Sequence, residues 1–166
     1  ARDAIYRLPA PPARIPPPDA PLEPLRALTG GVLLDLARAS RSALAQWADP
    51  IRSQDYEVGL GKAAGEWLGR LTGFHRVERW GAWGDKMLLG AVETQATLSN
   101  DFFTMQLTVR PSARGSLESS LVARGLMSLA AAGSSPIMIE HDGEHTEATE
   151  ALLKAGFKVQ SILLVQ

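Results

Sequence analysis

Residues 107–119, with the sequence LTVRPSARGSLES, combine residue types that can hold an anion. Arg114 provides a planar cation, Gly115 lets a ligand approach the backbone, and Ser116 can cap a helix or donate a hydrogen bond. A buried strand precedes this loop and a helix follows at once, so free amides and a partial positive charge would meet there. A diphosphate would fit such a site. The alternative is a tight strand-to-helix turn, with Gly115 placed for backbone reasons and Arg114 for solubility.

A second polar cluster is the segment EHDGEH at residues 140–145. Imidazole and carboxylate groups suit zinc, but His141 and His145 would need one helical turn to face the same ion, and Gly143 lies between them. An acidic loop at the end of a strand is the interpretation that we favour. The chain has no Gly-x-Ser-x-Gly elbow for serine hydrolysis, and no dinucleotide or P-loop fingerprint.

The elements that must position these groups follow from hydrophobic periodicity. Helices are predicted over residues 32–47, 56–71, 116–132 and 146–155, and strands over residues 77–83, 86–98, 102–110, 137–139 and 158–166. Gly84 and Asp85 predict a two-residue hairpin turn. Thr146 is expected to cap the last helix, and Gly156 follows it as the residue that ends it.

The order of these elements predicts the fold class. Three strands in succession with short turns form an antiparallel meander, and the strand–helix–strand that follows is a right-handed crossover to a parallel neighbour. We therefore expect an α+β, or mixed α/β, domain with about four helices. Its sheet switches from antiparallel to parallel after Val109.

Prolines are concentrated near the start of the chain. Eight of the 11 lie between Pro9 and Pro24, which excludes helix and interior strand there. Residues 1–24 are expected to be a proline-rich linker or extended strap, with a short strand over residues 4–8, and residues 25–166 to be the folded domain. A proline-rich segment of this kind is also typical of a linker to an upstream domain.

Composition restricts the partners. The formal net charge is −1, which argues against a broad surface for nucleic acid or anionic membrane. The chain has no cysteine, which removes disulfides and thiolate chemistry. No apolar run approaches the roughly 18 to 20 residues of a membrane span. A cytoplasmic location is the expectation.

Two motifs carry a resemblance to a known family. The pattern Val-x-Pro-x-x-Arg-Gly at Val109 to Gly115 resembles the acetyl-coenzyme A motif of the GNAT superfamily of N-acetyltransferases, and Ala-Gly-Phe at residues 155–157 resembles its later motif. The resemblance covers about residues 25–166, together with the order of the elements. Together with the proline-rich segment that precedes it, this region resembles the C-terminal domain of a tandem GNAT protein.

The resemblance implies an enzyme that moves an acetyl group from acetyl-CoA directly to an amine of a small molecule or peptide. The strand at residues 137–139 would diverge from the preceding strand and leave a slot for the cofactor. The pantetheine arm would pair with the backbone of Leu107, Thr108 and Val109. The pyrophosphate would be received by the amides of Arg114, Gly115, Ser116, Leu117, Glu118 and Ser119.

The sequence also departs from the family pattern. Leu117 and Ser119 occupy positions that are usually small, and the Glu118 carboxylate would compete with a diphosphate for the helix N-terminus. Leu152 stands where the family often has tyrosine, and His145 where it has asparagine. These departures support an alternative, a catalytically degenerate GNAT-fold domain with a structural or regulatory role.

Two carboxylates are weak candidates for the general base. Asp101 matches by spacing a carboxylate that some members use, but aspartate is also common in turns for local reasons. Glu93 is flanked by apolar strand residues, and it could equally face solvent. We also expect the sheet edge beside residues 158–166 to be completed by residues 4–8, an upstream domain or a second subunit.

Overall fold

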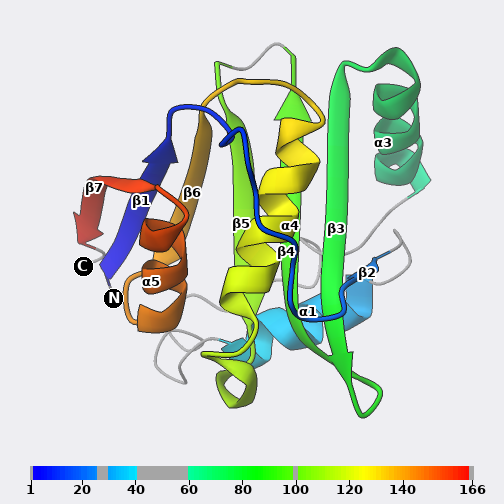
Figure 1. Ribbon diagram of the computed structural model, residues 1–166. Helices are drawn as coiled ribbons and strands as arrows, with labels where there is room; N and C mark the ends of the chain where they lie inside the picture. The colour runs from blue at the N-terminus through cyan, green and yellow to red at the C-terminus, as the bar shows by residue number, and fades with distance from the viewer. Residues whose placement is uncertain (1, 26–29, 41–59, 99–100, 165–166) are drawn as a thin grey trace.

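The structure, a computed structural model, describes residues 2–25, 30–40, 60–98 and 101–164. These residues form one mixed β-sheet with helices on both of its faces (Figure 1). In chain order the elements are β1 (Arg2–Leu8), β2 (Glu23–Pro24), α1 (Gly30–Ser40), α3 (Leu60–Thr72), β3 (His75–Gly84), β4 (Met87–Thr97), β5 (Phe103–Val109), the 3-10 helix η3 (Pro111–Ala113), α4 (Glu118–Ala130), β6 (Ile137–Asp142), α5 (Thr146–Lys154) and β7 (Lys158–Leu164).

The strand order is β2-β3-β4-β5-β6-β1-β7. Only β5 and β6 pair in parallel, and the other neighbouring strands are antiparallel. The mixed α+β class, the meander and the crossover through α4 are therefore confirmed. Helices α4 and α5 cover one face of the sheet and α1 lies behind the other (Figure 1).

Strand β1 confirms the prediction that residues 4–8 pair with the last strand, although its place between two strands was not predicted. It pairs antiparallel with β6 on one side and with β7 on the other. Residues 4–8 do lie beside residues 158–164, but they lie inside the sheet, and β7 is the last strand of the described order. The reason is burial, because Tyr6 and Leu8 are both in the core, where the middle of a sheet places them.

The proline-rich segment is an ordered strap. After β1 the chain crosses in front of α4 and reaches β2 beside β3 (Figure 1). The amides of Asp19 and Ala20 donate hydrogen bonds to the hydroxyl of Ser120 at 3.1 and 3.0 Å, and Ile15 and Leu22 pack against the core. Because proline-rich chain is extended and lacks amide donors, it can cross a helix without needing a sheet partner.

Helix α4 packs closely on the sheet. Its buried residues Leu121, Val122 and Leu129 recur at helical spacing and are at most 2% exposed. Gly125 lies where a Cβ atom would come within 2.5 Å of the Sδ of Met105 on β5. The missing side chain at Gly125 therefore lets the middle of α4 lie close to β4 and β5.

Some boundaries differ from prediction. The hairpin between β3 and β4 turns at Asp85 and Lys86, whose φ angles are 48° and 66°, one residue later than expected. Strand β6 is longer than residues 137–139. Residues 41–47 and 56–59 of the two leading helices, and residues 99–100 of the second turn, lie outside the described residues. Among the described helices, none has the length and apolarity needed to cross a membrane.

Candidate cofactor and acceptor site

The loop between β5 and α4 carries two arginines that are both anchored to the protein. Arg110 Nε donates to the carbonyl of Leu88 at 2.8 Å, and its guanidinium also pairs with Asp35. Arg114 Nη2 donates to the carbonyl of Ser40, at the end of α1, at 2.9 Å. Arg114, which was predicted to meet an anion, and Arg110 therefore stabilise the loop against α1 and β4.

The start of α4 is not capped as predicted. The Ser116 hydroxyl donates to the carbonyl of Ala113 at 2.7 Å, and Leu117 takes the N-cap position without a side-chain cap. Gly115 has a φ of 82°, in the region where glycine is favoured, so the loop can turn its amide inward. Ser119, in the first turn of α4, is exposed.

The Glu118 carboxylate occupies the amides at this turn. Its Oε2 accepts hydrogen bonds from Gly115 N at 2.9 Å and from Leu117 N at 3.2 Å. Its Oε1 lies 2.8 Å from His145 Nε2, and both side chains are 4% exposed. At the predicted anion site, a carboxylate of the same chain therefore accepts the hydrogen bonds of these two amides.

The two histidines of the EHDGEH segment are buried, whereas Glu140 and Glu144, at the end of β6 and in the loop after it, are exposed. His141 belongs to β6, and His145 is the N-cap residue of α5 in place of Thr146. Their ring centroids lie 5.1 Å apart. Burial, and then the neighbouring His145, lower the pKa of His141 to about 4. Among the described residues, no group of three or more potential ligands could hold a metal ion.

Strands β5 and β6 pair only briefly. Their register joins Phe103 to Ile137 and Thr104 to Met138, and no further pair follows in the described chain. A cavity of about 290 Å³ lies at this point. It is lined by Ile5, Glu93, Gln95, Phe102, Thr104, Met105, Gln106, Met138 and Glu140. The divergence predicted for the cofactor slot is therefore present.

Two carboxylates line this cavity. Glu93 on β4 is held by Arg79 Nε at 2.6 Å and by the side-chain amide of Gln95 at 2.7 Å. Glu140 on β6 is exposed, and no hydrogen bond or ion pair from the described residues holds its carboxylate. Asp101 is exposed in the turn before β5 and does not line the cavity. Glu140 is thus the less constrained of the two carboxylates, and its sequence pattern did not single it out as a candidate base.

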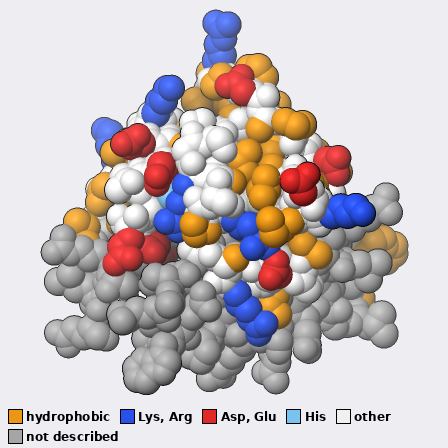
Figure 2. Space-filling view, turned by 90° about the horizontal axis from the view of Figure 1, so that it is seen from below, with side chains coloured by type: hydrophobic (Ala, Val, Ile, Leu, Met, Phe, Trp, Pro, Cys, Tyr) orange, Lys and Arg blue, Asp and Glu red, His pale blue; other side chains and the backbone are white. Residues whose placement is uncertain are grey.

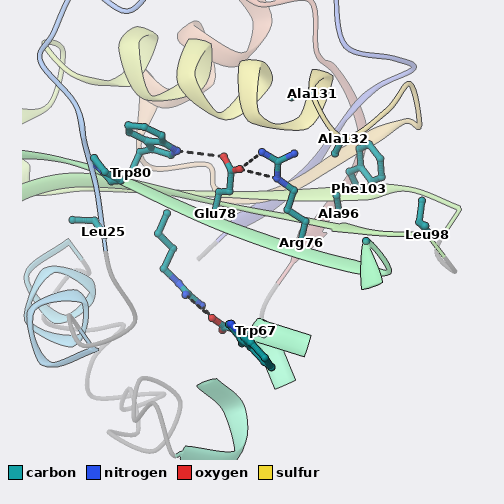
Figure 3. A pocket seen from close by; sticks show the side chains of 14 residues that line it. Leu25, Trp67, Arg76, Glu78, Trp80, Ala96, Leu98, Phe103, Ala131 and Ala132 are labelled. Atoms are coloured by element: carbon teal, nitrogen blue, oxygen red, sulfur yellow. Dashed lines mark hydrogen bonds and ion pairs between the residues drawn. The ribbon is translucent and has the colours of Figure 1, made fainter. Parts of the chain in front are cut away.

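A larger cavity, of about 900 Å³, opens along β3. Trp80, Glu78 and Arg76 lie on one side of this strand and Trp67 lies on the other (Figure 3). Burial would raise the pKa of Glu78, but hydrogen bonds from Ser128, Arg76 and Trp80 lower it overall. The residues of this cavity bind one another, so it presents paired rather than free charges.

The residues expected to hold the pantetheine arm belong to β5. Leu107, Thr108 and Val109 lie in β5 opposite Val92, Ala91 and Gly90 of β4. Leu152, at the place where the family often has tyrosine, belongs to α5, is fully buried and does not line the cavity. The end of the molecule at which α4 begins shows acidic and basic side chains interspersed with hydrophobic ones (Figure 2).

No family model and no curated protein matches the sequence. Solved structures do resemble the fold. An acetyltransferase from the GNAT family of Colwellia psychrerythraea superposes with a TM-score of 0.59 at 19% identity, covering 96% of this chain and 53% of that one. A tandem GNAT protein from the clavulanic acid biosynthesis pathway gives 0.57 at 17% identity, covering 95% and 50%.

A protein of Salmonella typhimurium, solved with its cofactor acetyl-CoA, gives a TM-score of 0.61 at 13% identity, covering 85% of this chain and 80% of that one. The chain thus spans about half the length of the first two proteins. Together with the mixed sheet, the crossover and the divergence of β5 from β6, these similarities show that this chain has the fold of the GNAT acetyltransferases.

Proposed function

We propose that this domain is an acyl-CoA N-acyltransferase of the GNAT type, which transfers an acetyl group to an amine. The observation that carries the proposal is the cavity where β5 and β6 part, because two carboxylates line it at the open end of a strand pair. A cavity of about 290 Å³ is the size of a small substrate group. The fold similarity supports the same chemistry.

The chain offers donors that suit the cofactor. The amides of Gly115 and Leu117 already hold a carboxylate oxygen, so their chemistry fits a phosphate oxygen once Glu118 has moved away. The backbone of residues 107–109 would hold the pantetheine arm on the side of β5 that β6 has left. When bound, acetyl-CoA supplies an activated thioester carbonyl.

The acceptor amine needs a base, and we assign this role to Glu140. The amine nitrogen would form its new bond to the acyl carbon as the carbon–sulfur bond breaks, coenzyme A would leave as the thiolate with the electron pair of that bond, and Glu140 would take the proton that the nitrogen loses. Glu93 orients the amine and does not accept its proton, because Arg79 and Gln95 already donate hydrogen bonds to its two oxygens. The acceptor is a small-molecule or peptide amine, and Met138 and Ile5 supply its apolar contacts.

The test is acetyl transfer to a panel of amines: spermidine, an amino-acid amide, and peptides with a free N-terminus or a lysine. Mass spectrometry should detect an acetylated product. Glu140→Gln should lower kcat by about 10²-fold or more, with an unchanged KM for acetyl-CoA. Glu144→Gln removes a carboxylate that lies outside the cavity, and it should leave the rate unchanged. Absence of product from every amine would overturn the proposal.

The second candidate is a non-catalytic domain of a longer protein, and the contacts of Glu118 are the observation that favours it. If these contacts are permanent, no diphosphate reaches the amides. Leu152 supports the same candidate, because this buried leucine stands where the family often has a tyrosine and cannot act as a general acid. If a calorimetric titration with millimolar acetyl-CoA gives no binding heat for either the wild type or Glu118→Ala, this candidate is favoured over the first.

A further inference from the structure

The start of α4 holds an internal ligand. Both Gly115 N and Leu117 N donate to one oxygen of Glu118, and His145 Nε2 lies against the other oxygen. A buried polar group is stable only where it is hydrogen-bonded, and both oxygens of Glu118, whose side chain is 4% exposed, have hydrogen-bond partners. The carboxylate is thus fixed by two helix N-termini, those of α4 and α5.

We propose that Glu118 competes with the diphosphate of an acyl donor for the amides of Gly115 and Leu117. In this conformation the domain therefore binds a donor through its pantetheine arm and disfavours a diphosphate. The inference rests on the proposed function and goes beyond it, because it names the residue that sets donor specificity. A diphosphate oxygen and the Glu118 oxygen need the same two amides. Two anions cannot share these amides without strong repulsion.

Two buried nitrogens beside this cluster, Arg114 Nε and His141 Nε2, have no hydrogen-bond partner among the described residues. The His141 ring lies 5.1 Å from the His145 ring, and Arg114 and Glu118 both influence the titration of His141. Nearly all polar atoms in a folded interior are paired, so these nitrogens are available to a new partner if the Glu118 carboxylate moves.

Side-chain volume strengthens the exclusion. Leu117 is 8% exposed, and its isobutyl group packs in the core beside Leu121 and Gly90. Its amide faces the site, but the buried side chain prevents the turn from opening to make room for a larger anion. A phosphate can therefore enter only where the carboxylate now lies.

The experiment measures the Kd of three probes by calorimetry: acetyl-CoA, S-acetyl-pantetheine, which lacks the diphosphate, and inorganic pyrophosphate. Each is titrated against the wild type, Glu118→Gln and Glu118→Ala. Glu118→Gln removes the charge but keeps the shape, and Glu118→Ala frees both amides. The matched control is Glu144→Gln, which removes one exposed carboxylate from the loop before α5. Circular dichroism confirms that each variant is folded.

Acetyl-CoA should bind Glu118→Ala at least about tenfold tighter than the wild type, with Glu118→Gln between them, because charge-assisted hydrogen bonds become available to the ligand. Pyrophosphate should follow the same order. S-acetyl-pantetheine should bind all four proteins within about twofold, and the control should match the wild type.

Two results would overturn the inference, and they differ. If S-acetyl-pantetheine binds but neither Glu118 variant gains affinity for acetyl-CoA or pyrophosphate, then Glu118 does not compete, although the proposed function stands. If no acyl donor binds any variant, the proposed function fails and the inference fails with it. If Glu118→Ala does not fold, the order of wild type and Glu118→Gln decides the question alone.

Discussion

The carboxylate of Glu118 and the imidazole of His145 join the N-termini of α4 and α5 at 2.8 Å. This contact links the helix of the parallel crossover to the helix that precedes β7. Since both side chains are 4% exposed, removing either one leaves the other buried without its partner. The pair should therefore be energetically coupled.

A double-mutant cycle measures this coupling. Glu118→Ala, His145→Ala and the double variant should give a coupling free energy of about 1–3 kcal/mol from urea denaturation at pH 7. The double variant should be more stable than the two single effects predict by addition, because no unpaired group remains. Simple additivity of the two changes would show that the contact contributes nothing to stability.

Gly125 provides a test of how closely α4 packs on the sheet. A Cβ atom there would lie 2.5 Å from Met105 Sδ and 3.0 Å from Val92 Cγ2. Gly125→Ala should therefore destabilise the fold by about 1–2 kcal/mol, because overpacking outweighs the higher helix propensity of alanine.

The control is Gly65→Ala in α3, where a Cβ atom would meet nothing within 4 Å. This change should be neutral or stabilise by up to about 1 kcal/mol. Thermal or urea unfolding separates the two outcomes. Equal effects at Gly125 and Gly65 would mean that α4 can move away from the sheet without cost.

The periodicity of the sequence predicted where helices and strands lie better than which strands pair with one another. Alternation of Phe103, Met105 and Leu107 with polar residues identified β5, because one face of that strand is buried and the other is not. The place of β1 could not be predicted, since an alternating pattern shows which face of a strand is buried but not which strands flank it. Its two ladders join segments more than a hundred residues apart.

The site was predicted in part for the same reason. Arg114 and Gly115 located the anion-binding turn, and Glu118 was recognised as a competitor within it, because these residues are neighbours in sequence. The partner of Glu118 was not predicted, since His145 lies 27 residues away and reaches it only when α4 and α5 begin side by side. Glu140 was missed because β6 was expected to end at Ile139.

Arg79 ties α3 to the sheet. Its guanidinium bonds Glu66 of α3 at 3.1 Å and Glu93 of β4 at 2.6 Å. Burial would lower the pKa of Arg79, but these carboxylates more than offset it, so its pKa is raised. Arg79→Gln should destabilise the fold by about 2 kcal/mol and speed amide hydrogen exchange in α3, because two carboxylates lose their cation.

The control for Arg79 is Arg76→Gln. The Arg76 side chain is 43% exposed and its partner Glu78 lies in the same strand, so its loss should cost less than about 1 kcal/mol. Hydrogen exchange in α3 should not change in this variant. If both arginine variants behave alike, the contacts of Arg79 do not dock α3.

His141 predicts how stability depends on pH. Its folded pKa of about 4 lies below its usual value of 6.5, so folding favours the neutral ring. The unfolded chain binds a proton as the pH falls through 6.5 while the folded protein does not, and stability is therefore lost between about pH 6.5 and pH 4. The folded protein should lose on the order of 2 kcal/mol between pH 7 and pH 5 through this group.

The comparison is with His141→Gln, which has the same polarity and cannot titrate. Urea denaturation at pH 7 and pH 5 should show a loss in the wild type that exceeds the loss in the variant by that amount. The groups acting on His141 are His145, Asp142, Arg114 and Glu118, and all of them remain in the variant. An equal loss in both proteins would mean that the His141 ring is protonated as readily in the fold as in the unfolded chain.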